Sequence, residues 1–111
     1  MTEYVFLYRN GPEKLSPEFM QQQMPKWGVW FKDLGAKGAL KNIGQPLDRA
    51  GKLVSGKGRA VTDGLFAEAK DIIGGYSIIE AKDLDHAVEL SRGCPIFDVG
   101  GAVEIRPTMT M

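Results

Sequence analysis

The chain of 111 residues predicts an α+β protein in which helices cover one face of an antiparallel sheet. Short runs rich in β-branched and aromatic residues recur along the chain and indicate strands. Two longer segments carry helix start and stop signals. The resulting order is strand, helix, strand, hairpin strands, helix and strand, and the length fits a single domain over residues 1–111.

Strands are predicted near both ends of the chain and through its middle. The first covers residues 4–8, Tyr-Val-Phe-Leu-Tyr, and stops at the turn-forming sequence Asn10-Gly11-Pro12. Short β segments separated by glycine- and proline-containing turns follow over residues 40–47, 52–55, 58–62 and 72–81. Gly74-Gly75 within the last of these indicates a bulge or a close approach by another group. The strand over residues 99–106 closes the chain.

The first helix is expected to begin at Ser16-Pro17, an N-cap hydroxyl followed by proline at the first helical position. Apolar residues then recur at spacings of three and four on one helical face: Met20, Met24, Trp27, Phe31 and Leu34. Pro25 removes one backbone hydrogen bond, so we expect either a kink or a first segment that ends near Met24. Trp27 and Trp30 cannot both face fully inward, so one of them is expected to line a cavity or an interface.

The second helix is predicted over residues 83–93. Asp83 supplies an N-cap, and Gly93 follows the last turn. The predicted core stripe consists of Leu84, Ala87, Val88 and Ser91. Pro95 prevents the helix from continuing.

This order of elements is that of a ferredoxin-like split βαβ sandwich, with the helices on one face of an antiparallel sheet. The other face also carries apolar residues, because Val5 and Leu7 alternate with the three aromatic residues of the first strand. A sheet solvated on one side would alternate apolar and polar residues more regularly. The sequence therefore predicts a homodimer in which a second copy of the chain covers this face.

Composition excludes several classes of partner. The 14 basic and 14 acidic residues balance, which argues against nucleic acid and anionic membrane surfaces as partners. No apolar run approaches the roughly 18 residues of a membrane span. The lone Cys94 cannot form an intramolecular disulfide and no leader segment is recognised, so we expect a cytoplasmic protein.

The common catalytic and cofactor motifs are missing. Gly51-Lys52 and Gly56-Lys57-Gly58-Arg59 do not complete a phosphate-binding loop, and hairpin turns explain both segments. One histidine and one cysteine cannot supply a typical zinc site, so no metal and no cofactor is expected. His86 is expected on the solvent side of its helix, and Cys94 is expected to be a packing residue.

The segment of residues 62–71 has the composition of a candidate site. It places carboxylates and a lysine between two β segments, where a connecting loop could present them together. The simpler alternative is that Asp63-Gly64 forms a turn and that Glu68 pairs with Lys70 on the surface. Composition alone favours this structural alternative.

The same segment carries a resemblance to a known family. Residues 63–70, Asp-Gly-Leu-Phe-Ala-Glu-Ala-Lys, with Gly74-Gly75-Tyr76 and Asp83-Leu84-Asp85-His86-Ala87, closely resemble the YCII-related proteins of the DGPF type, a PhnB-like group named for an Asp-Gly-Pro-Phe run. The resemblance covers nearly the whole chain. It implies a dimeric α/β barrel of ferredoxin-like subunits in the bacterial cytoplasm, with a small-molecule pocket and no established reaction.

The resemblance implies a set of ligand-binding residues: Asp63, Gly64, Phe66, Glu68 and Lys70. Two departures from the family pattern stand out. Leu65 replaces the proline of the motif, and the only histidine, His86, lies at a position unrelated to the His/Asp pair of the broader family. No catalytic residue is therefore assigned, and whether the protein is an enzyme stays open.

Two functions follow as alternatives. The first is a small-molecule-binding or weakly enzymatic protein with a pocket between sheet and helices and with Asp63, Glu68 and Lys70 at its rim. The second is a noncatalytic dimeric interaction or regulatory module in which the segment is only a turn. Cofactor-free oxygenase chemistry is a third, weaker possibility, since it rests on fold analogy alone.

Overall fold

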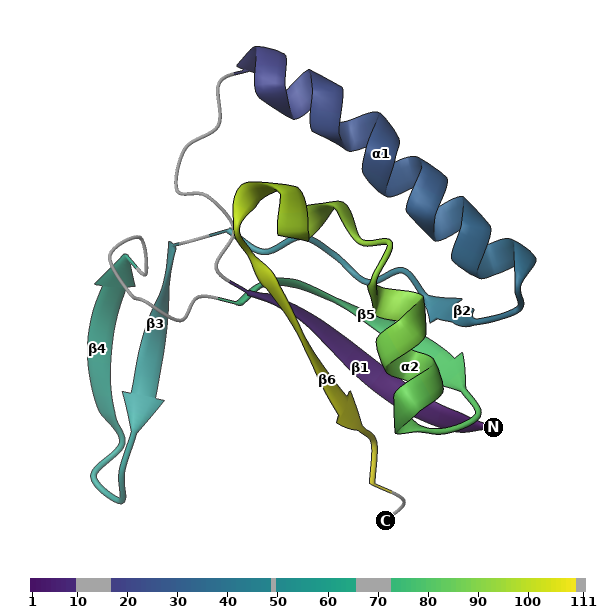
Figure 1. Ribbon diagram of the computed structural model, residues 1–111. Helices are drawn as coiled ribbons and strands as arrows, with labels where there is room; N and C mark the ends of the chain where they lie inside the picture. Colours follow the sequence, from purple (N-terminus) through teal and green to yellow (C-terminus); the bar gives the residue numbers. More distant parts are fainter. Residues whose placement is uncertain (10–16, 49, 66–72, 110–111) are drawn as a thin grey trace.

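A computed structural model describes residues 1–9, 17–48, 50–65 and 73–109, and Figure 1 shows its arrangement. The elements are β1 (Thr2–Arg9), α1 (Pro17–Ala36), β2 (Leu40–Asn42), β3 (Ala50–Ser55), β4 (Ala60–Leu65), β5 (Ile73–Ala81), α2 (Leu84–Ser91), the 3-10 helix η2 (Pro95–Val99) and β6 (Ala102–Pro107). Their order confirms the α+β prediction.

Four strands form one antiparallel sheet in the order β2-β5-β1-β6. This is the strand arrangement expected of a ferredoxin-like fold. The β3–β4 hairpin is inserted in the chain between β2 and β5. Both α-helices lie on the same side of the sheet, as Figure 1 shows. The predicted covering of one sheet face by helices is therefore confirmed.

The core lies between this sheet and the helices. Alternation along β1 buries Tyr4, Phe6 and Tyr8, and the cross-strand partners of Tyr4 and Phe6 on β5, Ile79 and Ser77, are also buried. Phe6 is fully buried at the centre of the sheet, where β5 and β6 flank it. The helices and loops complete the core with Trp30, Leu34, Ala39, Ala87, Leu90, Cys94 and Ile96.

Helix α1 corrects part of the prediction. It runs through Pro25 without a break, so the alternative of a first segment ending near Met24 is wrong. Met24 is exposed and Gln23 is buried instead. Trp30 is buried while Trp27 is only partly buried, as expected for two tryptophans that cannot both face inward. The large indole of Trp30 thus determines which side of the helix faces the sheet.

The segment from α2 to β6 also differs from the prediction in part. Asp83 caps α2 by accepting a hydrogen bond from the His86 N–H at 2.8 Å, as predicted. The buried residues are Ala87, Leu90 and Ser91, whereas Leu84 is exposed, so the predicted core stripe was wrong at this position. The final strand begins three residues later than predicted, because residues 95–99 form η2.

His86 is half-buried and not simply solvated. Its Nδ1 accepts a hydrogen bond from the Lys82 N–H at 3.0 Å, while its own N–H donates to Asp83. The two bonds satisfy backbone donors at the start of α2. The expectation of a purely solvent-facing side chain was therefore incomplete, and the residue has a capping role.

Glycines shape the end of β5, as the sequence predicted. The register between β1 and β5 shifts after Tyr8, which pairs with Gly75, so that Arg9 pairs with Ile73 and Gly74 is the extra residue of a bulge. A Cβ atom on Gly75 would lie 3.1 Å from the carbonyl oxygen of Gln45. Both the bulge and the close backbone approach are therefore confirmed.

The β3–β4 hairpin, which we call the arm, projects away from the four-stranded sheet (Figure 1). Its six residue pairs run from Ala50↔Leu65 to Ser55↔Ala60, and all residues of 50–62 are exposed. Gly56 and Arg59 adopt positive φ in its turn, where the sequence predicted one. The turn predicted at Gly51-Lys52 was wrong, because both residues lie within strand β3. The projecting arm helps explain a radius of gyration of 15.5 Å, against about 13 Å for a compact domain of this length.

A buried chain of hydrogen bonds crosses the core between β1, β5 and the segment after β2. The Tyr8 hydroxyl donates to Ser77 Oγ at 2.8 Å, and Ser77 Oγ donates to the Ile43 carbonyl oxygen at 2.6 Å. Ser77 is fully buried, so the chain satisfies polar atoms that water does not reach.

We predict that Ser77→Ala lowers the free energy of unfolding by about 1–3 kcal/mol, because it leaves the Tyr8 hydroxyl and the Ile43 carbonyl without their partner. Tyr8→Phe should cost less, within about 1 kcal/mol, since Ser77 keeps its bond to Ile43. Urea unfolding of the two single variants and the double variant measures these differences. Equal losses of unfolding free energy in the two single variants would contradict the proposed order of the hydrogen bonds, from Tyr8 to Ser77 to Ile43.

Candidate functional site

The structure places two of the five predicted ligand-binding residues, and both lie in the arm. Asp63 and Gly64 belong to strand β4, where they pair with Lys52 and Gly51 of β3. The expectation that they start a connecting loop or form a turn was therefore wrong, because the hairpin extends to Leu65. Phe66, Glu68 and Lys70 lie outside the described residues.

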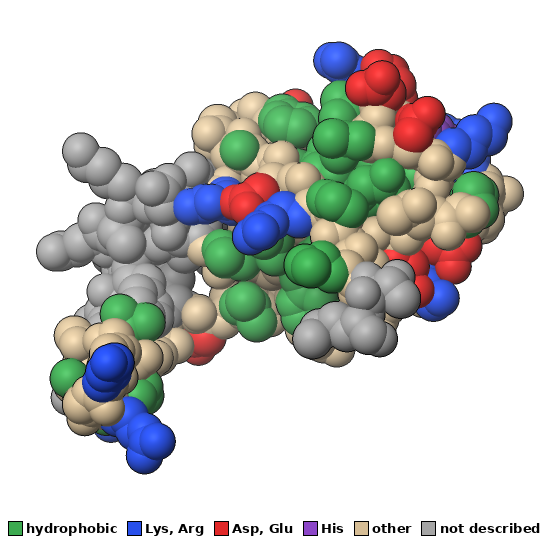
Figure 2. All heavy atoms as spheres, turned by 90° about the horizontal axis from the view of Figure 1, so that it is seen from below, with side chains coloured by type: hydrophobic (Ala, Val, Ile, Leu, Met, Phe, Trp, Pro, Cys, Tyr) green, Lys and Arg blue, Asp and Glu red, His purple; other side chains and the backbone are tan. Residues whose placement is uncertain are grey.

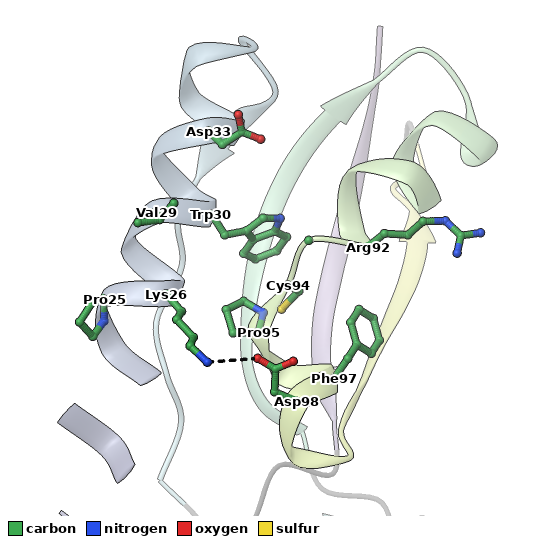
Figure 3. A pocket seen from close by; sticks show the side chains of 11 residues that line it. Pro25, Lys26, Val29, Trp30, Asp33, Arg92, Cys94, Pro95, Phe97 and Asp98 are labelled. Carbon is green, nitrogen blue, oxygen red and sulfur yellow. Dashed lines mark ion pairs between the residues drawn. The ribbon is translucent and has the colours of Figure 1, made fainter. Parts of the chain in front are cut away.

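The described part of the chain forms a groove between α1 and the segment that joins α2 to η2 (Figure 3). The groove has a volume of about 640 Å³. It lies on the helix-covered side of the sheet, but no strand residue lines it, so it is not the predicted pocket between sheet and helices, and Asp63 is not among the residues that line it. The lining residues are Pro25, Lys26, Val29, Trp30, Asp33, Arg92, Gly93, Cys94, Pro95, Phe97 and Asp98.

Buried apolar side chains form the inner part of the groove. Trp30 projects from α1 toward Cys94 and Pro95, and all three residues are buried. The indole N–H of Trp30 donates to the Leu90 carbonyl oxygen at 3.1 Å, so its polar atom is already satisfied by α2. Val29 and Phe97 line the more exposed part of the groove. A bound molecule would therefore meet mainly apolar surface.

Gly93 allows the two sides of the groove to approach each other. A Cβ atom at this position would lie 3.0 Å from Cδ1 of the Trp30 ring. The backbone after α2 can therefore run close to the indole only because no side chain intervenes. The glycine that was predicted to end α2 also determines the shape of the groove.

Charged side chains lie at the edge of the groove. Lys26 Nζ of α1 lies 3.7 Å from Asp98 Oδ2 of η2, and this ion pair links the two sides (Figure 3). Both side chains are more than half exposed, so the pair contributes little stability. Asp33 pairs with Lys37, and Arg92 points away from α1 and bonds to Glu89. Lys26 is thus the cation best placed to meet an anionic group in the groove.

The thiol of Cys94 is not activated for nucleophilic chemistry. Burial raises its pKa to about 12, and the nearby charge of Asp98 acts in the same direction. The thiolate, which is the reactive form, is therefore scarce at neutral pH. This agrees with the predicted packing role of Cys94, and the arrangement is suited to binding more than to covalent catalysis.

Burial also raises the pKa of the Tyr8 hydroxyl, which keeps it protonated as the donor to Ser77. Among the described residues, no group of three or more histidine, cysteine, aspartate or glutamate side chains could hold a metal ion. Within the described residues, no helix is both long enough and apolar enough to cross a membrane.

Sequence reasoning missed most of the groove because its walls come from distant parts of the chain. Lys26 and Asp98 are 72 positions apart and carry no recognisable motif. The one available signal was the pair of tryptophans, of which the one not facing inward was expected to line a cavity or an interface; the groove is lined instead by Trp30, the buried member of the pair.

The protein-family model of the YCII-related domain matches residues 2–111. A search of curated proteins found no match to the chain.

We predict that stability falls as the pH rises from about 9 toward about 12, because the unfolded chain releases the Cys94 proton before the folded chain does. Cys94→Ala should reduce this dependence, although the lost side chain lowers stability at every pH. Urea unfolding at neutral pH and at about pH 11 measures the difference. Tyr8→Phe serves as a second variant, because the raised pKa of Tyr8 also contributes to the loss of stability at high pH, and the substitution should reduce that contribution. An unchanged dependence in Cys94→Ala would contradict the assignment.

Proposed function

The chain belongs to the YCII-related domain family, a small family of unknown reaction, and within it we propose that this protein binds a small molecule in the groove between α1 and η2. The groove itself carries this proposal. Its volume of about 640 Å³ lies within the roughly 300–1,000 Å³ typical of ligand pockets. A mostly apolar lining with few polar groups is also typical of such sites.

The chemistry of the groove favours a flat apolar or aromatic molecule that carries one anionic group. The buried surface of Trp30 and Pro95 suits a ring, and Lys26 supplies a cation at the edge. The 3.7 Å distance between Lys26 and Asp98 is longer than a hydrogen bond, so a ligand carboxylate, sulfonate or phosphate could replace Asp98 as the partner of the ammonium group.

We predict that the fluorescent probe 8-anilinonaphthalene-1-sulfonate binds the groove, and that Lys26→Met weakens its binding while Asp98→Asn strengthens it. The first change removes the cation, and the second removes the competing carboxylate. Each effect should be roughly three- to tenfold in the dissociation constant, as for an exposed charge contact of about 1 kcal/mol. Fluorescence titration measures the affinities.

Two controls isolate the charge. N-phenyl-1-naphthylamine has the same ring system without the sulfonate, and its affinity should be the same for the parent and both variants. Lys32→Met makes the same change on α1 at a lysine that does not line the groove. Equal affinity of the sulfonate probe in the parent, Lys26→Met and Asp98→Asn would contradict the proposed site.

We also propose membership of the DGPF type, which the order of residues 63–70 supports despite Leu65 in place of proline. On this proposal Asp63, Gly64, Phe66, Glu68 and Lys70 take part in ligand binding. The assignment remains a prediction.

The predicted role of this segment can be tested on the best hit of a thermal-shift screen of anionic metabolites. If Asp63 and Lys70 contact the ligand, Asp63→Asn and Lys70→Met weaken its binding, measured by calorimetry, with little change in stability. Asn keeps the shape of Asp63, and Met keeps much of the apolar stem of Lys70. Unchanged affinity in both variants would contradict the ligand-binding role and favour the alternative, in which the segment has only a structural role.

A second candidate function, a noncatalytic dimeric module, is favoured by the uncovered face of the sheet. Val5, Leu7, Tyr76 and Ile78 pair across β1 and β5 on this face and are half-buried. Figure 2, which views the molecule from below the orientation of Figure 1, shows hydrophobic side chains with groups of charged ones among and around them. We propose that two copies associate through this face as a homodimer of the α/β-barrel type.

A further inference from the structure

We propose that the groove binds an elongated aromatic zwitterion, whose anionic group meets Lys26 and whose cationic group meets Asp33 at the other end of the groove. The inference rests on the proposed function and adds a second recognition residue, which selects the length and the charge of the ligand. Three observations support it: the position of Asp33 on α1, the different ion pairing at the two ends of the groove, and the charge balance of its lining.

Asp33 and Lys26 lie on the same side of α1, two turns apart. Both residues line the groove, and they are seven positions apart in the helix. With a rise of about 1.5 Å per residue, this spacing corresponds to roughly 10 Å along the helix axis. Val29 and Trp30 line the groove between them, as Figure 3 shows. A ligand lying along α1 therefore meets a cation first, then apolar surface and then a carboxylate.

The two ends of the groove differ in how their charges are paired. Lys26 faces Asp98 of η2, so this ion pair spans the groove (Figure 3). Asp33 instead pairs with Lys37 on its own side of the groove, with Asp33 Oδ2 and Lys37 Nζ 3.0 Å apart. This contact joins positions four apart, and both side chains are more than half exposed, so it is weak. The Asp33 carboxylate is therefore accessible to a second cation within the groove.

The wall opposite α1 does not supply that second cation. Among the described residues that line this wall, Arg92 is the only basic one. Its side chain points away from α1, and its Nε donates a hydrogen bond to Glu89 Oε1 at 3.1 Å. A ligand ammonium group beside Asp33 thus meets a carboxylate that no cation of the opposite wall neutralises.

The lining of the groove carries no net charge. Its two basic residues, Lys26 and Arg92, balance its two acidic residues, Asp33 and Asp98. A ligand with one charge of each sign keeps this balance, whereas a simple anion adds a negative charge beside two carboxylates, which disfavours its binding. The apolar surface around Trp30 accommodates the aromatic part of the ligand between its charged ends. The groove is therefore more complementary to an aromatic zwitterion than to a simple aromatic anion.

The test compares biphenyl-4-carboxylate with its 4′-aminomethyl derivative at neutral pH. The para-linked rings of the derivative hold its two charged groups apart by a distance similar to the spacing of Lys26 and Asp33 along α1. NMR titration measures the dissociation constants, and the indole N–H signal of Trp30 reports binding in the groove, which Trp27 does not line. The Trp27→Phe variant assigns this signal. We expect the derivative to bind at least about threefold more tightly than biphenyl-4-carboxylate, as for one exposed charge contact.

Four variants assign this gain in affinity to Asp33. Asp33→Asn keeps the shape of the side chain and removes its charge, so the aminomethyl group should no longer increase affinity. Lys37→Met removes the competing cation and should enlarge the increase. Lys26→Met should weaken both compounds by a similar factor and leave the increase in place. The matched control Asp85→Asn changes an acidic residue of α2 that does not line the groove, so it should have no effect. Thermal unfolding verifies that each variant is folded.

The outcomes separate this inference from the proposed function. If biphenyl-4-carboxylate binds and depends on Lys26, but the aminomethyl group gives no increase or the increase survives in Asp33→Asn, this inference is wrong and the proposed function stands. If neither biphenyl compound shifts the Trp30 signal, the proposed function fails together with the inference. Benzoate and 4-(aminomethyl)benzoate test the spacing, because the charges of the single-ring compound are too close together to reach both residues. An equal gain in this shorter pair would overturn the assignment of the cationic group to Asp33.

Discussion

The packing of the α1 aromatic residues against β1 is the contact on which the rest of the structure depends. The Trp30 and Phe6 rings lie nearly parallel with centroids 6.3 Å apart, and Tyr8 meets Trp30 edge-on at 6.1 Å. Trp30 also donates to the Leu90 carbonyl oxygen, so one indole joins α1, the sheet and α2. The groove exists because these same contacts set the separation between α1 and the segment after α2.

The sequence predicted features of the fold that depend on local chemistry. The Asp83 cap, the turn around Gly56 and the bulge at Gly74 each follow from a residue type at one position. Prediction from the sequence failed where tertiary packing decides which of two neighbouring residues of a helix is buried. The burial of Gln23 and exposure of Met24 follow the orientation that Trp30 imposes on α1. Apolar periodicity in the sequence favours Met24 over Gln23 as the buried residue, which is the wrong choice here.

The candidate site was harder to predict for a related reason. Resemblance directed attention to residues 63–70, of which Asp63 and Gly64 proved to be strand residues because the hairpin extends to Leu65. The groove is instead built from α1 and η2, and η2 itself was not predicted. A contact such as Lys26 with Asp98 follows from the topology of the sheet, which brings together segments that carry no shared motif.

The topology also separates the two proposed activities. The groove lies on the helix-covered side of the sheet, and the proposed contact between copies lies on the other. Strand β1 separates the two regions, because alternate residues such as Phe6 and Val5 face opposite sides, and no residue of β1 lines the groove itself. Phe6 supports the groove only through its stacking on Trp30. Changes at Lys26 therefore act on the groove alone, and changes at Val5 act on the uncovered face alone.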